Sequence, residues 1–386
     1  MTNQIGTPKG ALIAIGDMLD CCAKVKPEEE VLILADIQGL YGGDSTVDQE
    51  AITWIQTAVQ ARGANASVLW IDEPAKAHAW RIPPIAKAAM SVCDILINHS
   101  FNIVTEEMVE FRDHLTEHKI RMVRNFASTS SLLCTAWAQT PYELLSEIRY
   151  QTALLYKEGL SFQLTDPNGT HLEGIICAPE RRKGIPGGIS YASRRGAVGY
   201  LPWPEWLHSP IRLGNTDGVF IFEHMLSWWS RYIGISPYFS KPIQLIIQKN
   251  RIVEIKGGDE AEALKRFLAS MVERVGEGVY DFEFLHSGIH PQAMVGPHQC
   301  PNPLIRRIIE HSNARNIHFH IGAPSPTPQY PYWMHVTGDV RNPTFRVGNT
   351  LIHDRGHLTS LEHPAVTAIA KKYPDRPGVN PEPRAF

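Results

Sequence analysis

The chain has 386 residues, of which 43% are hydrophobic and 20% charged, and its formal net charge at pH 7 is -3. This length suits two globular domains, and so small a charge gives no reason to expect nucleic acid or an anionic membrane as a partner. No stretch approaches the about 18 unbroken apolar residues of a membrane span, and the first residues lack the pattern of a secretory signal. The six cysteines show no CxxC spacing, which indicates reduced thiols. We therefore expect a cytoplasmic protein that acts on a small molecule.

Apolar runs alternate with segments of helical spacing through the first half of the chain. They predict a helix at 11–24, a strand at 31–38, a helix at 48–62, a strand at 66–72, a helical segment at 84–91, strands at 93–99 and 122–126, and a helix at 141–157. Alternation of this kind is typical of a doubly wound α/β layer with a parallel sheet. His99 and Ser100 follow the third strand, where such sheets place their ligand-facing loops, although His99 could simply end the strand.

The sequence pattern changes near residues 155–159, where alternating strand and helix segments give way to short segments broken by glycine, proline and asparagine. We therefore expect an α/β domain at 1–157, a β-rich α+β domain at 158–370 that carries the site, and an extended or disordered tail at 371–386. The second domain is predicted to contain a hairpin around Asn168 and Gly169, a strand at 218–223, two strands around the turn at 249–250, and a helix at 259–275 with Asp259 as its N-cap.

The proline- and tryptophan-rich segment YLPWPEWLHSP, residues 200–210, is predicted to be a loop because each proline removes a ladder donor. It brings Glu205 and His208 together with Trp203 and Trp206. A carboxylate among aromatic planes suits a site that orients a flat or apolar ligand. The same residues would also suit a packing corner with an exposed glutamate.

Histidines concentrate late in the chain, where nine of the seventeen lie between residues 279 and 357. They are His286, His290, His298, His311, His318, His320, His335, His353 and His357, interleaved with Glu283, Asp339 and Asp354. Imidazole is a common metal ligand and titrates near pH 7, so the concentration favours a metal site or acid/base chemistry. Any one of these histidines could instead be a surface residue or a satisfied core residue.

Four motifs, LPWPEWLHSP, VYDFEFLHSGIHP, NIHFHIG and WMHVTGDVRNP, resemble by order and spacing the second domain of the aminopeptidase T metallopeptidases. They also resemble the related 2,5-dihydroxypyridine 5,6-dioxygenases. The resemblance extends over nearly the whole chain but is carried mainly by these motifs. It implies a metal-dependent enzyme that assembles as a homo-oligomer, at least a dimer.

The aminopeptidase pattern, in which two divalent metals are bound, maps onto this chain with departures. By resemblance Glu205, Glu283, His320 and His335 fall on metal ligands, and Tyr330 lies near the catalytic tyrosine. Pro204 replaces a glycine of the pattern, and the match at Glu283 requires a one-residue insertion. Thr337 replaces the aspartate of the H-x-D pair, so a second metal would be poorly held unless Asp339 substitutes for it.

The dioxygenase pattern is an iron site made of two histidines and one carboxylate. An ungapped match places Phe284 at the first histidine, but His286 lies on the same side of a strand and could serve. The missing carboxylate is again the one replaced by Thr337. In favour of this pattern, His99 and Ser100 match a His-Ser pair beside the dioxygenase pocket.

Three hypotheses follow. The leading one is a metal-dependent hydrolase that cleaves a C–N, amide-type bond with water activated by Zn²⁺ or Mn²⁺. The metal would be held by Glu205, His320, His335 and either His286 or Glu283, with Glu205, His99, Tyr330 and His208 as candidate catalytic residues. The alternatives are an Fe²⁺ ring-cleaving dioxygenase acting on a hydroxylated pyridine, and a binding protein without metal. The nearby aromatic residues favour a small, planar or cyclic substrate over a peptide.

Overall fold

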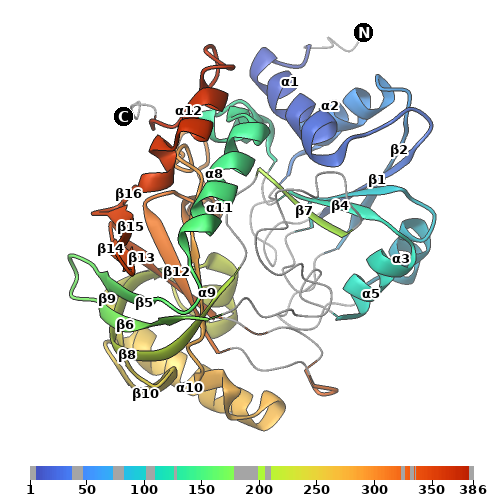
Figure 1. Cartoon of the computed structure of the whole chain (residues 1–386). Helices are drawn as coiled ribbons and strands as arrows, with labels where there is room; N and C mark the ends of the chain where they lie inside the picture. Colours follow the sequence, from blue (N-terminus) through green and yellow to red (C-terminus); the bar gives the residue numbers. More distant parts are fainter. Residues whose placement is uncertain are drawn as a thin grey trace.

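The computed structural model describes residues 6–36, 47–72, 82–100, 109–125, 128–177, 199–204, 210–322, 327–330, 334 and 336–381. Three of the predicted site residues, Glu205, His208 and His335, lie outside these ranges, as do Trp206, Tyr332 and Trp333. Figure 1 shows two units side by side, each built on its own sheet.

The first unit contains a five-stranded parallel sheet in the order β2-β1-β3-β4-β7. Its strands are β1 (Glu30–Asp36), β2 (Asn65–Ile71), β3 (Ile95–Asn98), β4 (Arg121–Asn125) and β7 (Gly199–Trp203). The central strands β1 and β3 are almost entirely buried because helices cover both faces of the sheet, with α1 and α2 above it and α3 and α5 below it in Figure 1. The predicted doubly wound layer is confirmed.

Four predicted helical segments of the first unit form, as α1 with η1, α2, α3 and α8, whereas α5, α6 and α7 were not predicted. The helices are α1 (Lys9–Gly16), the π-helix η1 (Asp17–Ala23), α2 (Gln49–Gln60), α3 (Pro84–Met90), α5 (Val109–Glu117), α6 (Ser130–Leu133), α7 (Ala136–Gln139) and α8 (Tyr142–Leu155). In α2 the Asp48 carboxylate caps the N-terminus by accepting from the Ala51 amide at 2.8 Å. Beyond its C-terminus, Gly63 adopts a φ of +77°, a conformation that favours glycine.

The segment at 200–210 was expected to be a loop, and that prediction is wrong for its first residues. Residues 199–203 form β7, which pairs in parallel with β4 along its whole length. The physical reason is the strand's position: among the described residues β7 is at the edge of the sheet, where a proline such as Pro202 need not donate to a second neighbour.

The second unit is organised around a large sheet whose path runs β11-β12-β13-β8-β6-β5-β14-β15-β16, with β9 paired to β8 and β10 to β9. Its strands are β5 (Ser161–Thr165), β6 (His171–Ile176), β8 (Ile211–Met225), β9 (Tyr238–Gln248), β10 (Arg251–Lys256), β11 (Phe284–Ser287), β12 (Asn316–Ile321), β13 (Val336–Arg341), β14 (Thr344–Val347), β15 (Thr350–Asp354) and β16 (His357–Leu358). All the strand pairings of this sheet in the described ranges are antiparallel, which confirms the predicted β-rich unit.

Both predicted hairpins form. The turn between β5 and β6 is held by the Asp166 carboxylate, which accepts from the amides of Asn168 and Thr170 at 2.9 and 2.8 Å. The turn between β9 and β10 has positive φ at both Lys249 and Asn250, as a tight two-residue hairpin requires.

Helices cover this sheet and join the two units. They are α9 (Ser227–Ile233), α10 (Asp259–Val275), the 3-10 helix η4 (Glu277–Tyr280), α11 (Pro303–His311), the 3-10 helix η5 (Thr359–Glu362) and α12 (Pro364–Ala370). The N-cap of α10 is Gly258, one residue before the predicted Asp259. None of the helices in the described ranges combines the length and the apolar character needed to cross a membrane.

The two faces of the second sheet differ in chemistry around β12. Phe319 belongs to a buried aromatic cluster with Phe220 and Phe282, at ring-centroid distances of 5.1 Å. Its neighbours His318 and His320 point to the opposite face because side chains alternate along a strand. One face of β12 therefore packs an apolar core, and the other presents imidazoles.

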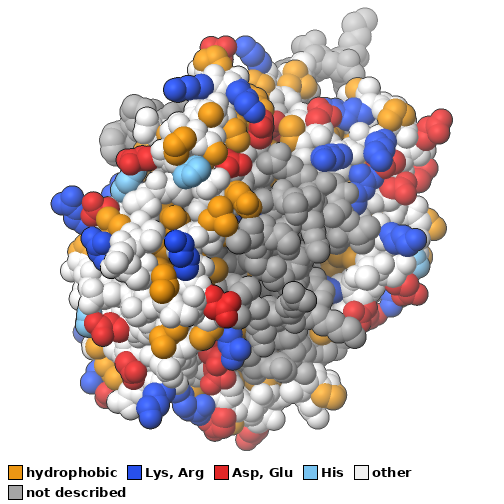
Figure 2. All heavy atoms as spheres, viewed as in Figure 1, with side chains coloured by type: hydrophobic (Ala, Val, Ile, Leu, Met, Phe, Trp, Pro, Cys, Tyr) orange, Lys and Arg blue, Asp and Glu red, His pale blue; other side chains and the backbone are white. Residues whose placement is uncertain are grey.

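The surface of the molecule carries charges of both signs. Figure 2 shows lysine and arginine side chains interspersed with aspartate and glutamate over the described part of the face in view. This mixture agrees with the small formal net charge of the whole chain, -3.

Candidate metal centre

Three histidines converge on one face of the second sheet. In the antiparallel pair β11 and β12, His286 lies directly opposite His318, and Phe284 lies opposite His320. Opposed residues and alternate residues share a face, so His286, His318 and His320 point to the same side. All three are buried. We call them the three-histidine group.

The rings of this group are close enough to share one ion. Ring centroids of His286 lie 4.7 Å from those of His318 and 4.8 Å from those of His320, and each residue offers a ligand atom within 4.8 Å of the others. A tetrahedral zinc with nitrogen bonds of about 2.0 Å would separate its ligand nitrogens by about 3.3 Å, so the three side chains would draw closer together around a bound ion. The donor set therefore fits a divalent transition metal.

Strand β13 adds two polar side chains next to the group. Thr337 lies opposite His320 and Asp339 lies opposite His318. The Thr337 hydroxyl is buried and makes no hydrogen bond with any described residue. Thr337, which replaces the aspartate of the H-x-D pair, thus lies on the same face of the sheet as His320 and offers a hydroxyl there in place of a carboxylate.

Asp339 is already engaged by two side chains of α11. Its carboxylate accepts from His311 Nδ1 at 3.0 Å and forms an ion pair with Arg307, and both partners are almost fully buried. The His311 ring also stacks on His318, with centroids 4.0 Å apart and an interplanar angle of 27°. Asp339 is therefore linked to the three-histidine group through His311.

Helix α11 delivers both of these side chains because Arg307 and His311 lie one turn apart on the same helical face. Its N-terminus is capped by the Asn302 side chain, which accepts from the Leu304 amide at 2.8 Å. Burial, then the charge of Arg341, lowers the pKa of Arg307 to about 10, so Arg307 stays charged at neutral pH and compensates the carboxylate charge of Asp339.

Two other predicted site residues, Glu283 and Tyr330, have arginine side chains as neighbours. Glu283 precedes β11, and its carboxylate lies 3.8 Å from Arg212 Nε. Tyr330 is buried beneath the guanidinium of Arg274, which lies 4.9 Å from its ring centroid. Glu283 is not among the described donors that converge with His320 and His286.

His99 lies at the carboxyl end of β3, next to β1, which is the switch point of the first sheet. Its amide donates to Leu34 O at 2.8 Å, and Arg124 of the neighbouring strand donates to Ser100 O. Burial, then the charge of Arg124, lowers the pKa of His99 to about 3. His99 is therefore neutral at neutral pH.

His318, the His311 ring that stacks on it, and the Asp339 and Arg307 side chains that pair next to His311 were not predicted as site residues. The signal for His318 was present in NIHFHIG, because alternation places His318 and His320 on one face. Asp339 was considered only as a replacement ligand. No local pattern marks Arg307 or His311 as their partners, since that contact joins a helix to a strand far along the chain.

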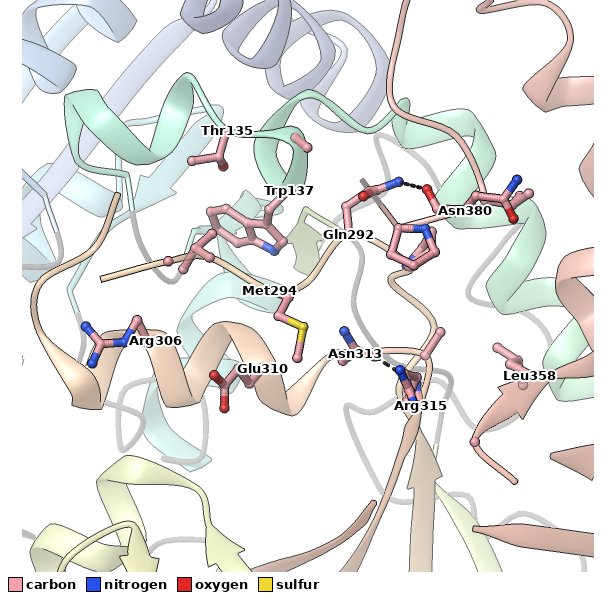
Figure 3. A pocket seen from close by; sticks show the side chains of 18 of the residues that line it. Thr135, Trp137, Gln292, Met294, Arg306, Glu310, Asn313, Arg315, Leu358 and Asn380 are labelled. Carbon is pink, nitrogen blue, oxygen red and sulfur yellow. Dashed lines mark hydrogen bonds between the residues drawn. The ribbon is translucent and has the colours of Figure 1, made fainter. Parts of the chain in front are cut away.

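A cavity of about 1210 Å³, shown in Figure 3, is lined by other described residues than the three histidines. Trp137, Met294 and Asn380 line it together with Arg306 and Glu310 of α11. The side chains of α11 that line the cavity and those that contact Asp339 lie on different sides of the helix. Helix α11 therefore contributes side chains both to the cavity and to the contacts of Asp339.

No protein-family model matches the chain, and no curated protein matches its sequence. Among solved structures, 2,5-dihydroxypyridine dioxygenase from Pseudomonas putida KT2440 is similar, with a TM-score of 0.63 and 14% identity over 91% of this chain and 98% of that one. The chain has the fold predicted from its motifs. Wild-type AmpT from Thermus thermophilus has a similar fold as well, with a TM-score of 0.54 and 12% identity over 90% of this chain and 98% of that one.

Proposed function

We propose that the chain is a metal-dependent hydrolase that cleaves a C–N, amide-type bond in a small cyclic or N-heteroaromatic substrate. The observation that carries the proposal is the three-histidine group, in which three buried histidines each offer a ligand atom within 4.8 Å of the others. The fold adds support, since the families that the motifs resemble are metal-dependent enzymes and the chain shares the fold of AmpT.

The donor set favours zinc and hydrolysis. Imidazole suits Zn²⁺, whereas Mn²⁺ prefers oxygen donors, and an Fe²⁺ oxygenase site commonly adds one carboxylate to two histidines. Among the described residues, the carboxylate beside the group, Asp339, is held by Arg307 and His311. A zinc ion with open positions lowers the pKa of a coordinated water and polarises a carbonyl. Glu205 and His335 stay predicted as further ligands.

His99 has a role that differs from proton transfer. A group whose pKa lies at about 3 is a weak base at pH 7. We therefore assign His99 to hydrogen bonding, in which its neutral ring orients a polar atom of the substrate. Proton transfer is left to Glu205, His208 or Tyr330, which stay predicted for that role.

A ring-cleaving dioxygenase with Fe²⁺ is the second candidate. It is supported by the fold, which the chain shares with 2,5-dihydroxypyridine dioxygenase as well as with AmpT. The pair His99 and Ser100, at the switch point of the first sheet, matches the dioxygenase motif as well. Its substrate would be a hydroxylated pyridine.

The decisive experiment measures metal content and turnover together. The purified chain, loaded separately with Zn²⁺, Mn²⁺ or Fe²⁺, is assayed with cyclic amides, hydroxypyridines and dipeptides, in air and without oxygen. We expect oxygen-independent cleavage of a cyclic amide by the zinc form. Oxygen uptake with a hydroxypyridine by the iron form would instead establish the dioxygenase, and cleavage of dipeptides alone would establish an aminopeptidase.

Variants test the ligand set itself. His286→Ala and His320→Ala should each lose bound metal and activity together, because two imidazoles hold a zinc ion far more weakly than three. His335→Ala should do the same if that residue completes the site. The matched control is His171→Ala, since the His171 side chain is 55% exposed on β6. Full metal retention by His286→Ala and His320→Ala would contradict the proposal.

A further inference from the structure

We propose that Arg307, Asp339 and His311 form a positioning unit that holds the His311 ring against His318 and so fixes how His318 presents its ligand nitrogen. This inference rests on the proposed function, because it concerns the metal at the three-histidine group. It assigns these three residues to orienting a ligand, not to contact with substrate.

The contacts around His318 are those of a clamped ring. His311 stacks on it from α11 at 4.0 Å and 27°, and His286 stacks on it from β11 at 4.7 Å and 26°. Two near-parallel neighbours leave the His318 ring little freedom to rotate. Asp339 lies opposite His318 on β13, so the carboxylate that holds His311 is fixed to the same sheet.

The hydrogen bonds define which nitrogen of His311 faces the carboxylate. His311 Nδ1 lies 3.0 and 3.2 Å from the two oxygens of Asp339, so Nδ1 carries the hydrogen and donates it. A carboxylate that accepts from a histidine in this way fixes the orientation of the ring. Arg307, fully buried beside the same carboxylate, in turn restrains Asp339.

A second metal at His311, His318 and Asp339 is the competing explanation, because these residues also offer ligand atoms within 4.8 Å of one another. The buried guanidinium of Arg307 opposes it. A divalent cation at Asp339 would meet that positive charge, and displacing Arg307 would leave a buried charge without its partner. Asp339 is therefore better suited to accept hydrogen bonds than to bind a metal.

The test uses Co²⁺ as the probe, because its absorption spectrum reports ligand geometry. The full chain is freed of metal by chelation and titrated with Co²⁺ in competition with a chromophoric chelator. Asp339→Asn and His311→Gln leave the three-histidine group intact, so both should still bind Co²⁺. We expect each to bind it about 10- to 100-fold more weakly and with an altered spectrum.

Three further variants make the test decisive. Glu310→Gln is the matched control, since Glu310 is a carboxylate of the same helix that pairs with Arg341 at 2.8 Å, and it should leave affinity and spectrum unchanged. Asp339→Asn could fail to fold because Arg307 loses its partner. In that case the double variant Asp339→Asn with Arg307→Met removes the unpaired charge. Its Co²⁺ affinity and that of His311→Gln then show whether the positioning unit strengthens metal binding. His286→Ala, which should lose Co²⁺ binding, tests the metal centre separately.

The outcomes are distinguishable. Wild-type affinity and spectrum in folded Asp339 and His311 variants, with binding lost in His286→Ala, would overturn the positioning unit and leave the proposed function standing. Unchanged binding in His286→Ala would instead refute the metal centre and the positioning unit with it. Weaker Co²⁺ binding with an altered spectrum in His311→Gln, together with unchanged affinity and spectrum in Glu310→Gln, would support the inference.

Discussion

His290 is one of the nine late histidines, yet its contacts are those of a structural residue. Its Nε2 lies 3.0 Å from Trp137 O, and its Nδ1 accepts from the Gln292 amide at 3.2 Å, so both nitrogens are used in the neutral ring. Burial lowers its pKa to about 3, despite hydrogen bonds that act in the opposite direction. The concentration of histidines in the sequence therefore contains members with different roles.

Buried histidines predict how stability depends on pH. His99 and His290 both have a pKa of about 3 when folded, against an ordinary value of 6.5, so the unfolded chain binds protons that the folded chain does not. Stability should be unaffected by these groups above about pH 6.5 and should fall from there towards pH 3, by about 1.4 kcal/mol per pH unit for each histidine.

Denaturant unfolding of the wild type and of His290→Gln between pH 7 and pH 5 measures this effect. The variant should show the smaller pH dependence, because it lacks one of the two histidines, whatever its stability at pH 7. Equal slopes in the two proteins would show that folding does not lower the pKa of His290.

At the scale of residues, periodicity can assign a side chain to one face of a strand, whereas a contact between distant segments has no local signal. His286 and His320 were recognised from motifs and do converge. His318 follows from the same alternation but was passed over in favour of the family pattern. His311 could not be assigned, because its role depends on an aspartate that a helix and a strand bring together only in the folded chain.

At the scale of elements, α11 carries the two side chains that contact Asp339, and its position depends on how the helix begins. Asn302 accepts from the Leu304 and Ile305 amides at 2.8 and 3.4 Å, and Pro303 begins the helix at a position that needs no amide donor. The buried residues Ile305 and Ile309 hold it against the unit. The cap therefore helps to fix the helix that supplies Arg307 and His311.

Asn302→Ala should lower the free energy of unfolding by about 1 kcal/mol, because the first amides of α11 lose their side-chain acceptor. Thermal or denaturant unfolding measures the change. Asn302→Asp is the control, since aspartate caps a helix equally well. Equal losses in both variants would mean that Asn302 contributes something other than the cap.

The junction after β11 predicts a second element-scale effect. A Cβ at Gly288 would lie 2.1 Å from Asn313 O and 2.7 Å from Ser312 O, both backbone atoms. Gly288→Ala should therefore force the strand and the loop apart and destabilise the chain by about 1–3 kcal/mol. Unfolding measurements on Gly288→Ala and on the control Gly378→Ala, where nothing lies within 4 Å, check this; similar stabilities would contradict it.

Strands and helices of both units could be predicted because their apolar residues repeat with clear periods. Sheet order could not, since pairing depends on contacts between distant segments. β7 shows the difference: Pro202 argued correctly against an interior strand, but nothing local indicated that residues 199–203 would reach the first sheet and join its edge.

On the scale of the whole molecule, the segment at 371–381 ties the end of the chain to the first unit. Arg376 forms an ion pair with Asp17 and donates from Nε to Gln139 O at 3.0 Å, and Gln292 Nε2 donates to the backbone of Gly378 at 2.8 Å. Tyr373 OH donates to Glu143 at 2.8 Å. These contacts join residues from both ends and from the middle of the sequence.

Arg376→Ala should lower the free energy of unfolding by about 2 kcal/mol, because it leaves the largely buried Asp17 carboxylate without its guanidinium. The control is Lys372→Ala in the same segment, whose side chain is 58% exposed and whose ion pair with Glu143 is screened by water. Denaturant unfolding of both variants checks the difference. A loss in Lys372→Ala as large as that in Arg376→Ala would show that the segment as a whole, not the buried pair, is responsible.

The pairing of β7 with β4 has a consequence for synthesis of the chain on the ribosome. Translation completes β4 at Asn125, but the strand that covers its outer edge is not finished until Trp203. Until then the free edge of β4 exposes unpaired amide and carbonyl groups, which are prone to pair with other chains. The nascent first unit thus stays open until the hairpin of β5 and β6, which belongs to the other unit, has already been made.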